Sequence, residues 1–416
     1  MKYVRTHETR DKFLADKDST SRGFRLAPTL YKYSDESEDE DNRDHIYLEL
    51  DDPRKHEGST YMEIALNSDV EFSFYIGNKS GDTQTTMTCT IDWGDDTIET
   101  KTITKDTYGF KLAHNYAAGS YKIELYDVDR DYSVVGYCVD PERSIFSSLI
   151  SHPSSVKRVV LGEEVVSIGV GVFKKCYSLT SIYIPESVVS IGVSTFADCT
   201  SLTSVYIPKS VISIERYAFW ECYSLTSVYI PKSVISIGRY AFNSCYNLTS
   251  IYLPEGVTII SQLTFYNCTS LKSIYIPESV TSIGDSAFQH CSSLTSIDIP
   301  EKVTSIGDSA FYGCSSLTSV YIPKGVTTIN QYVFSKCSSL KSIDIPEKVT
   351  SIGDSAFQDC SSLSSISSFN PTTPTLGGNI FLNLPANGTL HIKPGATGYD
   401  VWLSKLPEGW RIVEDL

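Results

Sequence analysis

Residues 268–290 read CTSLKSIYIPESVTSIGDSAFQH, and close variants of this phrase fill the second half of the chain. The repetition is clearest in nine cysteines that stand 23 residues apart: Cys176, Cys199, Cys222, Cys245, Cys268, Cys291, Cys314, Cys337 and Cys360. Phenylalanine precedes each of these cysteines by three residues, and leucine follows each by three. A spacing this regular indicates an internal repeat before it indicates any thiol chemistry.

The first half of the unit has the alternation of a β-strand. Ile274 and Ile276 point to one side of the chain. Ser273 and Tyr275 point to the other side, which is typical of a half-buried strand. Pro277 ends the strand, because it has no N–H to donate to a neighbouring strand.

The second half of the unit predicts two turns around a shorter apolar pair. Val280 and Ile283 form that pair, and Gly284 follows them as a turn residue. Residues 285–288 offer helix-capping side chains ahead of one turn of helix, which carries Phe288 inward. A single unit buries too little apolar surface to offset the entropy lost on ordering its backbone. Stacked units share their buried faces and backbone hydrogen bonds, so the repeats predict a solenoid.

The phrase IPESVTSIGDSAF at residues 276–288 resembles the repeat of the BspA-like leucine-rich repeat family. The resemblance covers about half of the chain, residues 156–369, as nine 23-residue units. It implies a curved, right-handed solenoid with its longer strands on the concave side. Residues 370–416, which contain Trp402 and Trp410, are similar to that family's C-terminal cap, and two tryptophans suit the covering of an exposed core end.

Residues 58–140 have a different character. Alternating runs such as residues 71–76 and 121–125, separated by Gly, Asn and Asp clusters, predict an antiparallel β-sandwich. The phrases IDWGDDT at 91–97 and HNYAAGSYKI at 114–123 resemble polycystic kidney disease (PKD) domains, which are immunoglobulin-like modules. Asp96 stands where that family usually has a second glycine.

The predicted fold class is therefore mainly β with short helical turns: a right-handed leucine-rich repeat solenoid preceded by an antiparallel β-sandwich. Residues 34–57 are predicted to be an acidic linker and residues 141–155 a second linker. Residues 1–33 have two open interpretations, a small folded unit or an arm that docks to a larger assembly.

Charge and hydropathy exclude two classes of protein. The chain carries 35 basic and 50 acidic side chains, a net charge of −15, and has no clustered basic face of the kind that binds nucleic acid. No window approaches eighteen continuous apolar residues, so we expect no membrane insertion. Residues 1–8 are followed by charged residues instead of an apolar stretch, so no secretory signal peptide is read there.

The cysteines do not predict a metal site or a cofactor. Metal ligands converge from close pairs, whereas stacked coils place the repeat thiols in one inward-facing file about 4.8 Å apart. We therefore expect small apolar packing groups without metal. Cys89 and Cys138 remain candidates for a disulfide in the sandwich, although the other cysteines favour a reduced protein.

Catalytic patterns are missing. No Ser/His/Asp or Cys/His arrangement and no phosphate-binding glycine motif is found, so we expect no enzyme. Paired carboxylates for sugar hydrolysis remain open, but nothing points to them. Asp92, Asp95 and Asp96 are candidate calcium ligands, yet a tight acidic turn more often accepts hydrogen bonds from its own backbone amides. We expect His114 to fix that turn.

The outward side of the predicted concave sheet is the candidate ligand-binding face. We call its central residues the tyrosine row: Tyr183, Tyr206, Tyr229, Tyr252, Tyr275, Asp298, Tyr321 and Asp344. Stacked tyrosines form an amphipathic platform for a protein or for sugar rings. They also stabilise a sheet by stacking on one another, and this structural interpretation stays open. A second, lateral contact surface is predicted at Tyr217, Trp220, Arg239 and Tyr240.

These features favour a non-catalytic binding or adhesion protein that presents the tyrosine row to a protein or glycan on a host or neighbouring cell. The family resemblance implies a bacterial cell-surface or secreted location. The alternative is a structural protein of a phage or prophage particle, such as a tail or host-recognition protein, which the missing signal peptide favours. A hydrolase of surface polymers is the third hypothesis and lacks motifs.

Overall fold

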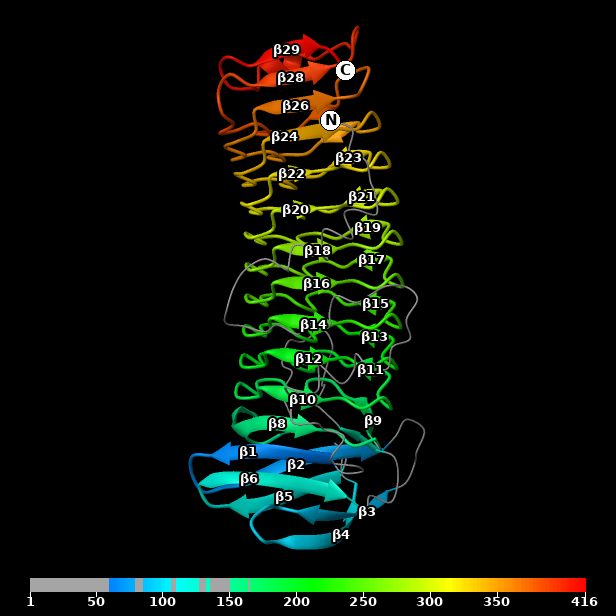
Figure 1. Ribbon diagram of the computed structural model, residues 1–416, viewed down its shortest axis with the longest axis vertical. Helices are drawn as coiled ribbons and strands as arrows, with labels where there is room; N and C mark the ends of the chain where they lie inside the picture. The colour runs from blue at the N-terminus through cyan, green and yellow to red at the C-terminus, as the bar shows by residue number, and fades with distance from the viewer. Residues whose placement is uncertain (1–59, 79–84, 106–109, 127–131, 135–149, 164) are drawn as a thin grey trace, which may run out of the picture. The chain divides into compact units, whose positions relative to one another are not determined.

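The computed structural model describes residues 60–78, 85–105, 110–126, 132–134, 150–163 and 165–416 (Figure 1). The predicted fold class is confirmed, because the described chain is mainly β, with antiparallel sheets first and a solenoid after them. Residues 58–416 form one compact unit. The arm predicted at residues 1–33 and the linker predicted at residues 34–57 lie outside the described residues. Within the described part of the chain, no helix is long and apolar enough to cross a membrane.

Seven strands form the two antiparallel sheets at the N-terminal end of this unit. They are β1 (Thr60–Leu66), β2 (Val70–Asn78), β3 (Thr86–Asp92), β4 (Ile98–Thr104), β5 (Phe110–Tyr116), β6 (Gly119–Tyr126) and β7 (Tyr132–Val134). One sheet has the order β1-β6-β3-β4 and the other the order β7-β2-β5. Alternate side chains of β3 are buried, and Phe72 of β2, Phe110 of β5 and Trp93, which directly follows β3, are among the largest buried side chains.

The antiparallel sheets continue into the solenoid without a break in hydrogen bonding. Strand β8 (Val156–Val160) pairs antiparallel with β1 and parallel with β10 (Ser181–Tyr183). Strand β9 (Val165–Ile168) pairs parallel with both β7 and β11 (Ser190–Ile191). The antiparallel region therefore covers the open end of the first coil, where a solenoid would otherwise leave unpaired backbone groups.

Residues 150–155, the described end of the predicted second linker, are fastened to the antiparallel region. The amide of Ser73 donates to Oγ of Ser151 over 2.8 Å, and the amide of Ser151 donates to the carbonyl of Ser73 over 2.9 Å. Ile150 is buried in the shared core. A short 3-10 helix, η3 (Pro153–Ser155), then leads directly into β8.

Each 23-residue unit forms one coil, and the coils stack as two files of parallel strands (Figure 1). The first file contains β10, β12 (Ser204–Tyr206), β14 (Ser227–Tyr229), β16 (Ser250–Tyr252), β18 (Ser273–Tyr275), β20 (Ser296–Ile297), β22 (Ser319–Val320), β24 (Ser342–Ile345), β26 (Ser365–Ser368), β28 (Thr389–Ile392) and β29 (Arg411–Glu414). The second file contains β11, β13 (Ser213–Ile214), β15 (Ser236–Ile237), β17 (Ile259–Ile260), β19 (Ser282–Ile283), β21 (Ser305–Ile306), β23 (Thr328–Ile329), β25 (Ser351–Ile352) and β27 (Thr375–Leu376). Paired residues occupy equivalent repeat positions, such as Tyr252 and Tyr275.

The third side of each coil differs from the predicted turn of helix. The amides of Gln289 and Cys291 donate within the coil to carbonyls three residues earlier, as in a tight helical turn. The amides of Ser286, Phe288 and His290 donate instead to the next coil, that of Phe288 to Ala310 over 2.8 Å. Ser286 and His290 take positive φ values of 53° and 62°, which turn their amides toward that coil. Hydrogen bonding between coils therefore replaces a continuous helix here.

A file of phenylalanines runs through the centre of the solenoid. Rings in adjacent coils stack with centroids 5.3–6.3 Å apart, from Phe173 to Phe381. Phe381 lies beyond the nine predicted units, in the segment predicted as the cap. Strands β27 and β28 pair with the preceding coil there, so the cap segment begins with a further, irregular coil.

Trp402 closes the C-terminal end of the phenylalanine file. It lies in the short helix α3 (Asp400–Leu403), is fully buried, and contacts the Phe381 ring with a centroid distance of 5.3 Å. Its indole N–H donates to Oγ1 of Thr373 over 2.6 Å. Trp402 thus shields the Phe381 ring from water, and the polar N–H of its indole has a hydrogen-bond partner.

We expect Trp402→Ala to lower the free energy of unfolding by about 3–5 kcal/mol, because it leaves a cavity and exposes the Phe381 ring. Urea unfolding followed by circular dichroism measures this loss. Leu382→Ala is the control, because the Leu382 side chain is 45% exposed and its removal costs little. Equal stabilities of the two variants would contradict the capping role of Trp402.

Candidate functional site

The tyrosine row lies on the outer side of the first file of strands. In each three-residue strand the central side chain is buried and its neighbours are half-buried, as for Ser273–Tyr275. Register pairs Tyr206 with Tyr229 and Tyr252 with Tyr275. Asp298 and Asp344 occupy the same repeat position and are exposed. The structure thus places the predicted row on one face of the coils.

Neighbouring rings of the row stack on one another. The Tyr252 and Tyr275 rings lie 4.7 Å apart with an interplanar angle of 3°, and the Tyr206 and Tyr229 rings lie 6.1 Å apart at 5°. Such contacts stabilise a sheet by themselves. They also hold the rings in one orientation.

The phenol hydroxyls extend to a column of carboxylates that sequence reasoning did not single out. Each acceptor is a glutamate 20 residues earlier, in the preceding coil. The pairs are Tyr183 to Glu163 at 3.2 Å, Tyr206 to Glu186 at 3.5 Å, Tyr275 to Glu255 at 2.9 Å and Tyr321 to Glu301 at 2.6 Å. Burial, together with Glu163, raises the pKa of Tyr183 to about 12, so this phenol stays protonated at neutral pH. In the sequence, this column corresponds to the residue that follows each repeat proline, and the identity of that residue varies.

The repeat cysteines are buried and unpaired, as predicted, but they are more than apolar packing groups. Each thiol after the first donates to the phenylalanine carbonyl 26 residues earlier, as Cys268 does to Phe242 over 3.1 Å. Burial raises the pKa of Cys268, Cys314 and Cys360 to about 12. These thiols therefore bind coil to coil and are poor nucleophiles.

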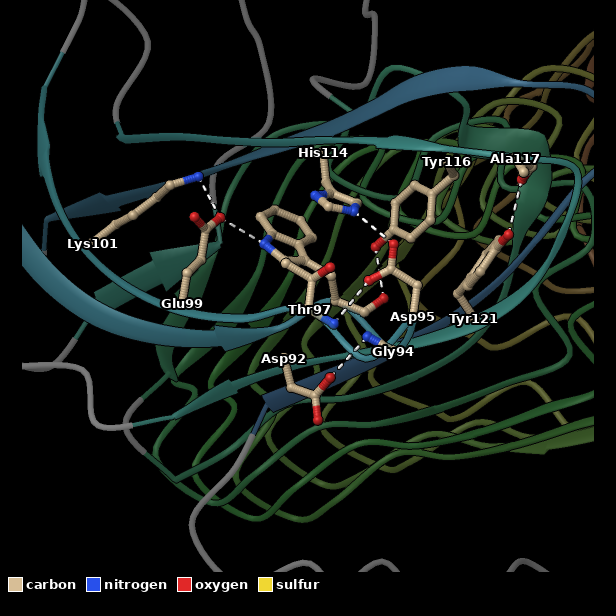
Figure 2. Close-up of polar contacts among 11 residues, drawn as sticks. Asp92, Gly94, Asp95, Thr97, Glu99, Lys101, His114, Tyr116, Ala117 and Tyr121 are labelled. Carbon is tan, nitrogen blue, oxygen red and sulfur yellow. Dashed lines mark hydrogen bonds and ion pairs between the residues drawn. The ribbon is translucent and has the colours of Figure 1, made fainter.

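The acidic turn between β3 and β4 uses its carboxylates on its own backbone (Figure 2). The amide of Gly94 donates to Asp92 over 2.8 Å, and the amide of Thr97 donates to Asp95 over 3.2 Å. These bonds agree with the interpretation of an acidic turn that caps its own amides. Among the described residues, no three His, Cys, Asp or Glu side chains converge as metal ligands. Cys138 lies outside the described residues, so its pairing with Cys89 stays a hypothesis.

His114 joins this turn to strand β5 (Figure 2). Its Nε2 lies 2.8 Å from Oδ2 of Asp95, and its ring stacks on Trp93 with a centroid distance of 4.9 Å. The Tyr116 hydroxyl donates to the carbonyl of Trp93 over 2.8 Å. Trp93 donates its indole N–H to Glu99 over 2.7 Å. The two phrases that resemble PKD domains therefore meet in one aromatic cluster.

The predicted lateral surface also comes together. The Tyr217 and Tyr240 rings stack 4.6 Å apart, and Trp220 meets Tyr217 edge-on at 6.1 Å. The ammonium of Lys174, from the first coil, lies 6.0 Å from the Trp220 ring. Arg239 is exposed beside Tyr240. The aromatic side chains of two adjacent coils and the Lys174 ammonium thus lie together, and the ring contacts account for the order of these side chains.

The stacked coils, the inward Phe–Cys–Leu core and the capped ends define a leucine-rich repeat protein. The family model described as BspA type leucine rich repeat region matches residues 166–295 and 258–388, which together are more than half of the chain. The chain belongs to this family. No curated protein matches it.

Solved structures of leucine-rich repeat proteins are similar to parts of the chain. The T. pallidum leucine-rich repeat protein is 32% identical, with 44% of this chain and 86% of that chain covered and a TM-score of 0.39. A leucine-rich repeat protein from Bacteroides ovatus is 23% identical over 68% of this chain and 91% of its own, with a TM-score of 0.39. The pneumococcal vaccine antigen PcpA is 18% identical over 68% and 83%, with a TM-score of 0.40.

We expect the nine repeat cysteines to resist iodoacetamide in the native protein and to react after unfolding in urea, because all nine are buried. Mass spectrometry of proteolytic peptides counts the modified sites. Cys89 and Cys138 are scored separately. Rapid modification of a repeat thiol in the folded protein at neutral pH would contradict the inward file.

The turn cluster predicts a pH dependence of stability. Burial pushes the pKa of Asp95 up, but hydrogen bonds from His114 and Thr97 outweigh it, so the pKa lies below its ordinary value. Asp95 therefore stabilises the fold above its unfolded pKa, and this contribution disappears as the pH falls through the folded pKa. We expect Asp95→Asn to lower the free energy of unfolding by about 1 kcal/mol at neutral pH and by much less in acid.

Urea unfolding of wild type and of Asp95→Asn, at neutral pH and in acid, measures the difference in the free energy of unfolding. Asp96→Asn is the matched control, because Asp96 is the exposed next residue of the same turn and takes a positive φ that asparagine also adopts. A difference between Asp95→Asn and wild type that does not change with pH would show that the carboxylate charge is unimportant.

Proposed function

We propose that this chain is a non-catalytic binding protein of the adhesion type that uses the tyrosine row to hold a protein or glycan ligand. One observation carries the proposal: tyrosines at one repeat position lie half-buried on a continuous outer face, in order and partly stacked. Tyrosine is suited to such a face because its ring gives a large contact area and its hydroxyl gives a hydrogen bond at the edge.

The composition of this face supports recognition. A serine stands two residues before each member of the row, so the outer side of the first file is made of tyrosine and serine columns. Tyrosine supplies rigid contact area at low entropic cost, and serine supplies adaptable hydrogen bonds, which is why both are frequent in antibody binding loops.

The pre-organised side chains of the tyrosine row also support the proposed binding function. Ring stacking and the bonds to Glu186 and Glu255 hold Tyr206 and Tyr275 before any ligand arrives. A ligand then immobilises few side chains on binding, and more of the contact energy appears as affinity. With a coil spacing of about 4.8 Å, the eight positions extend over about 34 Å, which is enough for a protein interface of ordinary size.

We infer a location on a bacterial cell surface, which the family resemblance implies. The antiparallel region, whose phrases at 91–97 and 114–123 resemble those of PKD domains, is proposed to be an immunoglobulin-like module that holds the solenoid at one end. The proposal does not include catalysis, because the thiols with raised pKa are buried and the turn carboxylates accept hydrogen bonds from their own amides.

Arrays of matrix proteins and glycans test the proposal. We expect wild-type protein to bind at least one array component, and the triple variant Tyr229→Ala, Tyr252→Ala and Tyr275→Ala to bind it at least about tenfold more weakly, because the central contacts are removed. Circular dichroism verifies folding of each variant.

The matched control changes residues beside the second file, in the coil of Tyr275 and in the two coils that follow it. Thr281→Ala, Thr304→Ala and Thr327→Ala remove exposed side chains there and leave the row intact. Absence of binding on both arrays, or equal binding by wild type and the tyrosine variant, would refute the proposed function.

A further inference from the structure

The second file of strands carries a face that lies apart from the tyrosine row. Its strands lie one above another along one side of the solenoid (Figure 1). Two repeat positions frame each two-residue strand: the residue directly before it and the residue two positions after it. For β19 these are Thr281 and Asp285, and both are exposed. We call the surface formed by these two positions and the residues between them the second-file face.

The column of residues two positions after the strands changes the sign of its charge at its centre. From β13 to β21 this column reads Arg216, Arg239, Gln262, Asp285 and Asp308. Two arginines and two aspartates therefore stand at equal numbers of coils on either side of the uncharged Gln262. A column in this order is complementary to its own reversed copy.

The next column along the chain follows the same order in side-chain size. Its residues, one position after the charged ones, are Tyr217, Tyr240, Leu263, Ser286 and Ser309. Large rings thus stand in the arginine coils and small side chains in the aspartate coils. The Tyr217 and Tyr240 rings stack 4.6 Å apart, so they project as one unit.

The column directly before the strands is apolar in its first half. Val189, Ile212 and Ile235 are 50–57% exposed, and the later coils have threonine in their place. In the central coil, Ile259 is 52% exposed at a position where both neighbouring coils have serine. Contiguous exposed apolar side chains with polar residues around them mark a contact surface.

We propose that the second-file face binds a second copy of this chain in antiparallel orientation, with a two-fold axis that runs along β17 in the central coil. In such an interface the same surface is used by both copies, and every contact between two different residues occurs twice. Around this axis, Arg239 meets the partner's Asp285. Arg216 meets the partner's Asp308 in the same way.

The same rotation matches the other two columns. Tyr240 comes to the partner's Ser286, so a large side chain meets a small one. Ile235 comes to the partner's Thr281, which is also β-branched and carries a methyl group. Ile259 lies in the coil that contains the axis and therefore meets the partner's Ile259. Apolar side chains that are exposed in one copy are covered in the pair.

Charge selects this orientation and this register. In a parallel pair the same coils face each other, so an arginine meets either an arginine or the isoleucine of its own coil, and never an aspartate. If one copy is shifted by one coil in the antiparallel pair, only one of its two arginines still meets an aspartate, and the other meets Gln262 or Gln331. Like charges in contact are costly and opposite charges fix the register.

The aspartates are already oriented by bonds within the chain. Oδ1 of Asp285 accepts from the amide of Asp308 over 3.0 Å, and Oδ2 of Asp308 accepts from Nε2 of Gln331 over 2.7 Å. A carboxylate accepts several hydrogen bonds, so both aspartates can bind a guanidinium in addition. Arginine suits this role because its planar group fits a carboxylate through two parallel bonds.

Sedimentation velocity of the full chain tests the inference. We expect the monomer to pass into a dimer between about 1 and 100 µM at low ionic strength, because a small interface with exposed charge pairs is weak. The dimer should dissociate more readily in about 0.5 M salt, since surface charges are then screened.

Two charge-reversal variants make the test specific for this register. One carries Arg216→Asp and Arg239→Asp, and the other carries Asp285→Arg and Asp308→Arg. Each variant alone brings like charges together, so we expect its dissociation constant to rise at least about tenfold. An equimolar mixture is expected to form a heterodimer, because every charged residue of the column then meets an opposite charge.

The mixture also controls for folding, because two misfolded variants would not restore association. Circular dichroism verifies the fold of each variant. Lys209→Glu combined with Lys324→Glu is the matched control: it changes the net charge as much as the arginine variant does, at exposed positions outside the second-file face. We expect its association to stay within about twofold of wild type.

A chain that stays monomeric up to about 100 µM at low ionic strength would overturn the inference. Association that is unchanged in both reversal variants would overturn it as well. The same holds for association that is lost in each variant and not recovered in the mixture, because arginine then does not face aspartate across an axis. The tyrosine row belongs to the first file, so these outcomes leave the proposed function to its own test.

Discussion

Hydrogen bonding between coils, repeated every 23 residues, is the constraint on which the rest of this structure depends. Each coil is too small to hold itself together, so its strands, its third side and its thiols all use groups of a neighbouring coil. The Phe288 amide bonds to Ala310, and the Cys268 thiol bonds to Phe242. A residue at one repeat position therefore lies beside the equivalent residues of the two neighbouring coils. Rows of identical side chains are the consequence.

Such a stack has two open ends, and the chain closes them in different ways. At the N-terminal end, strands β1 and β7 of the antiparallel region pair with β8 and β9 and extend the sheets of the first coil. At the C-terminal end, Trp402 covers the last phenylalanine of the file. The hydrogen bonds and the core of the coils are completed inside the stack and at both of its ends, so the outer positions vary without loss of the fold. The exchange of glutamate for lysine at Lys209 and Lys232 is one such variation.

Much of this arrangement could be predicted from particular residues. The strand before Pro277, the inward position of Phe288 and the burial of the cysteines follow from alternation and period. The bonds of the third side could not be predicted, because D-S-A-F is equally compatible with a helical turn and with turns that bond to the next coil. The further coil around Phe381 was missed because its spacing departs from the repeat.

The sequence by itself determined the class of fold, the inward and outward side of each strand, and which residues form the tyrosine row, because a fixed period leaves one arrangement that buries every apolar position. Only the tertiary structure decided which side chains of different coils meet. The Tyr275 hydroxyl donates to Glu255, the Cys268 thiol donates to the Phe242 carbonyl, and the His114 ring stacks on Trp93. These contacts depend on how far each turn advances the chain, and that distance is set by packing between coils and sheets.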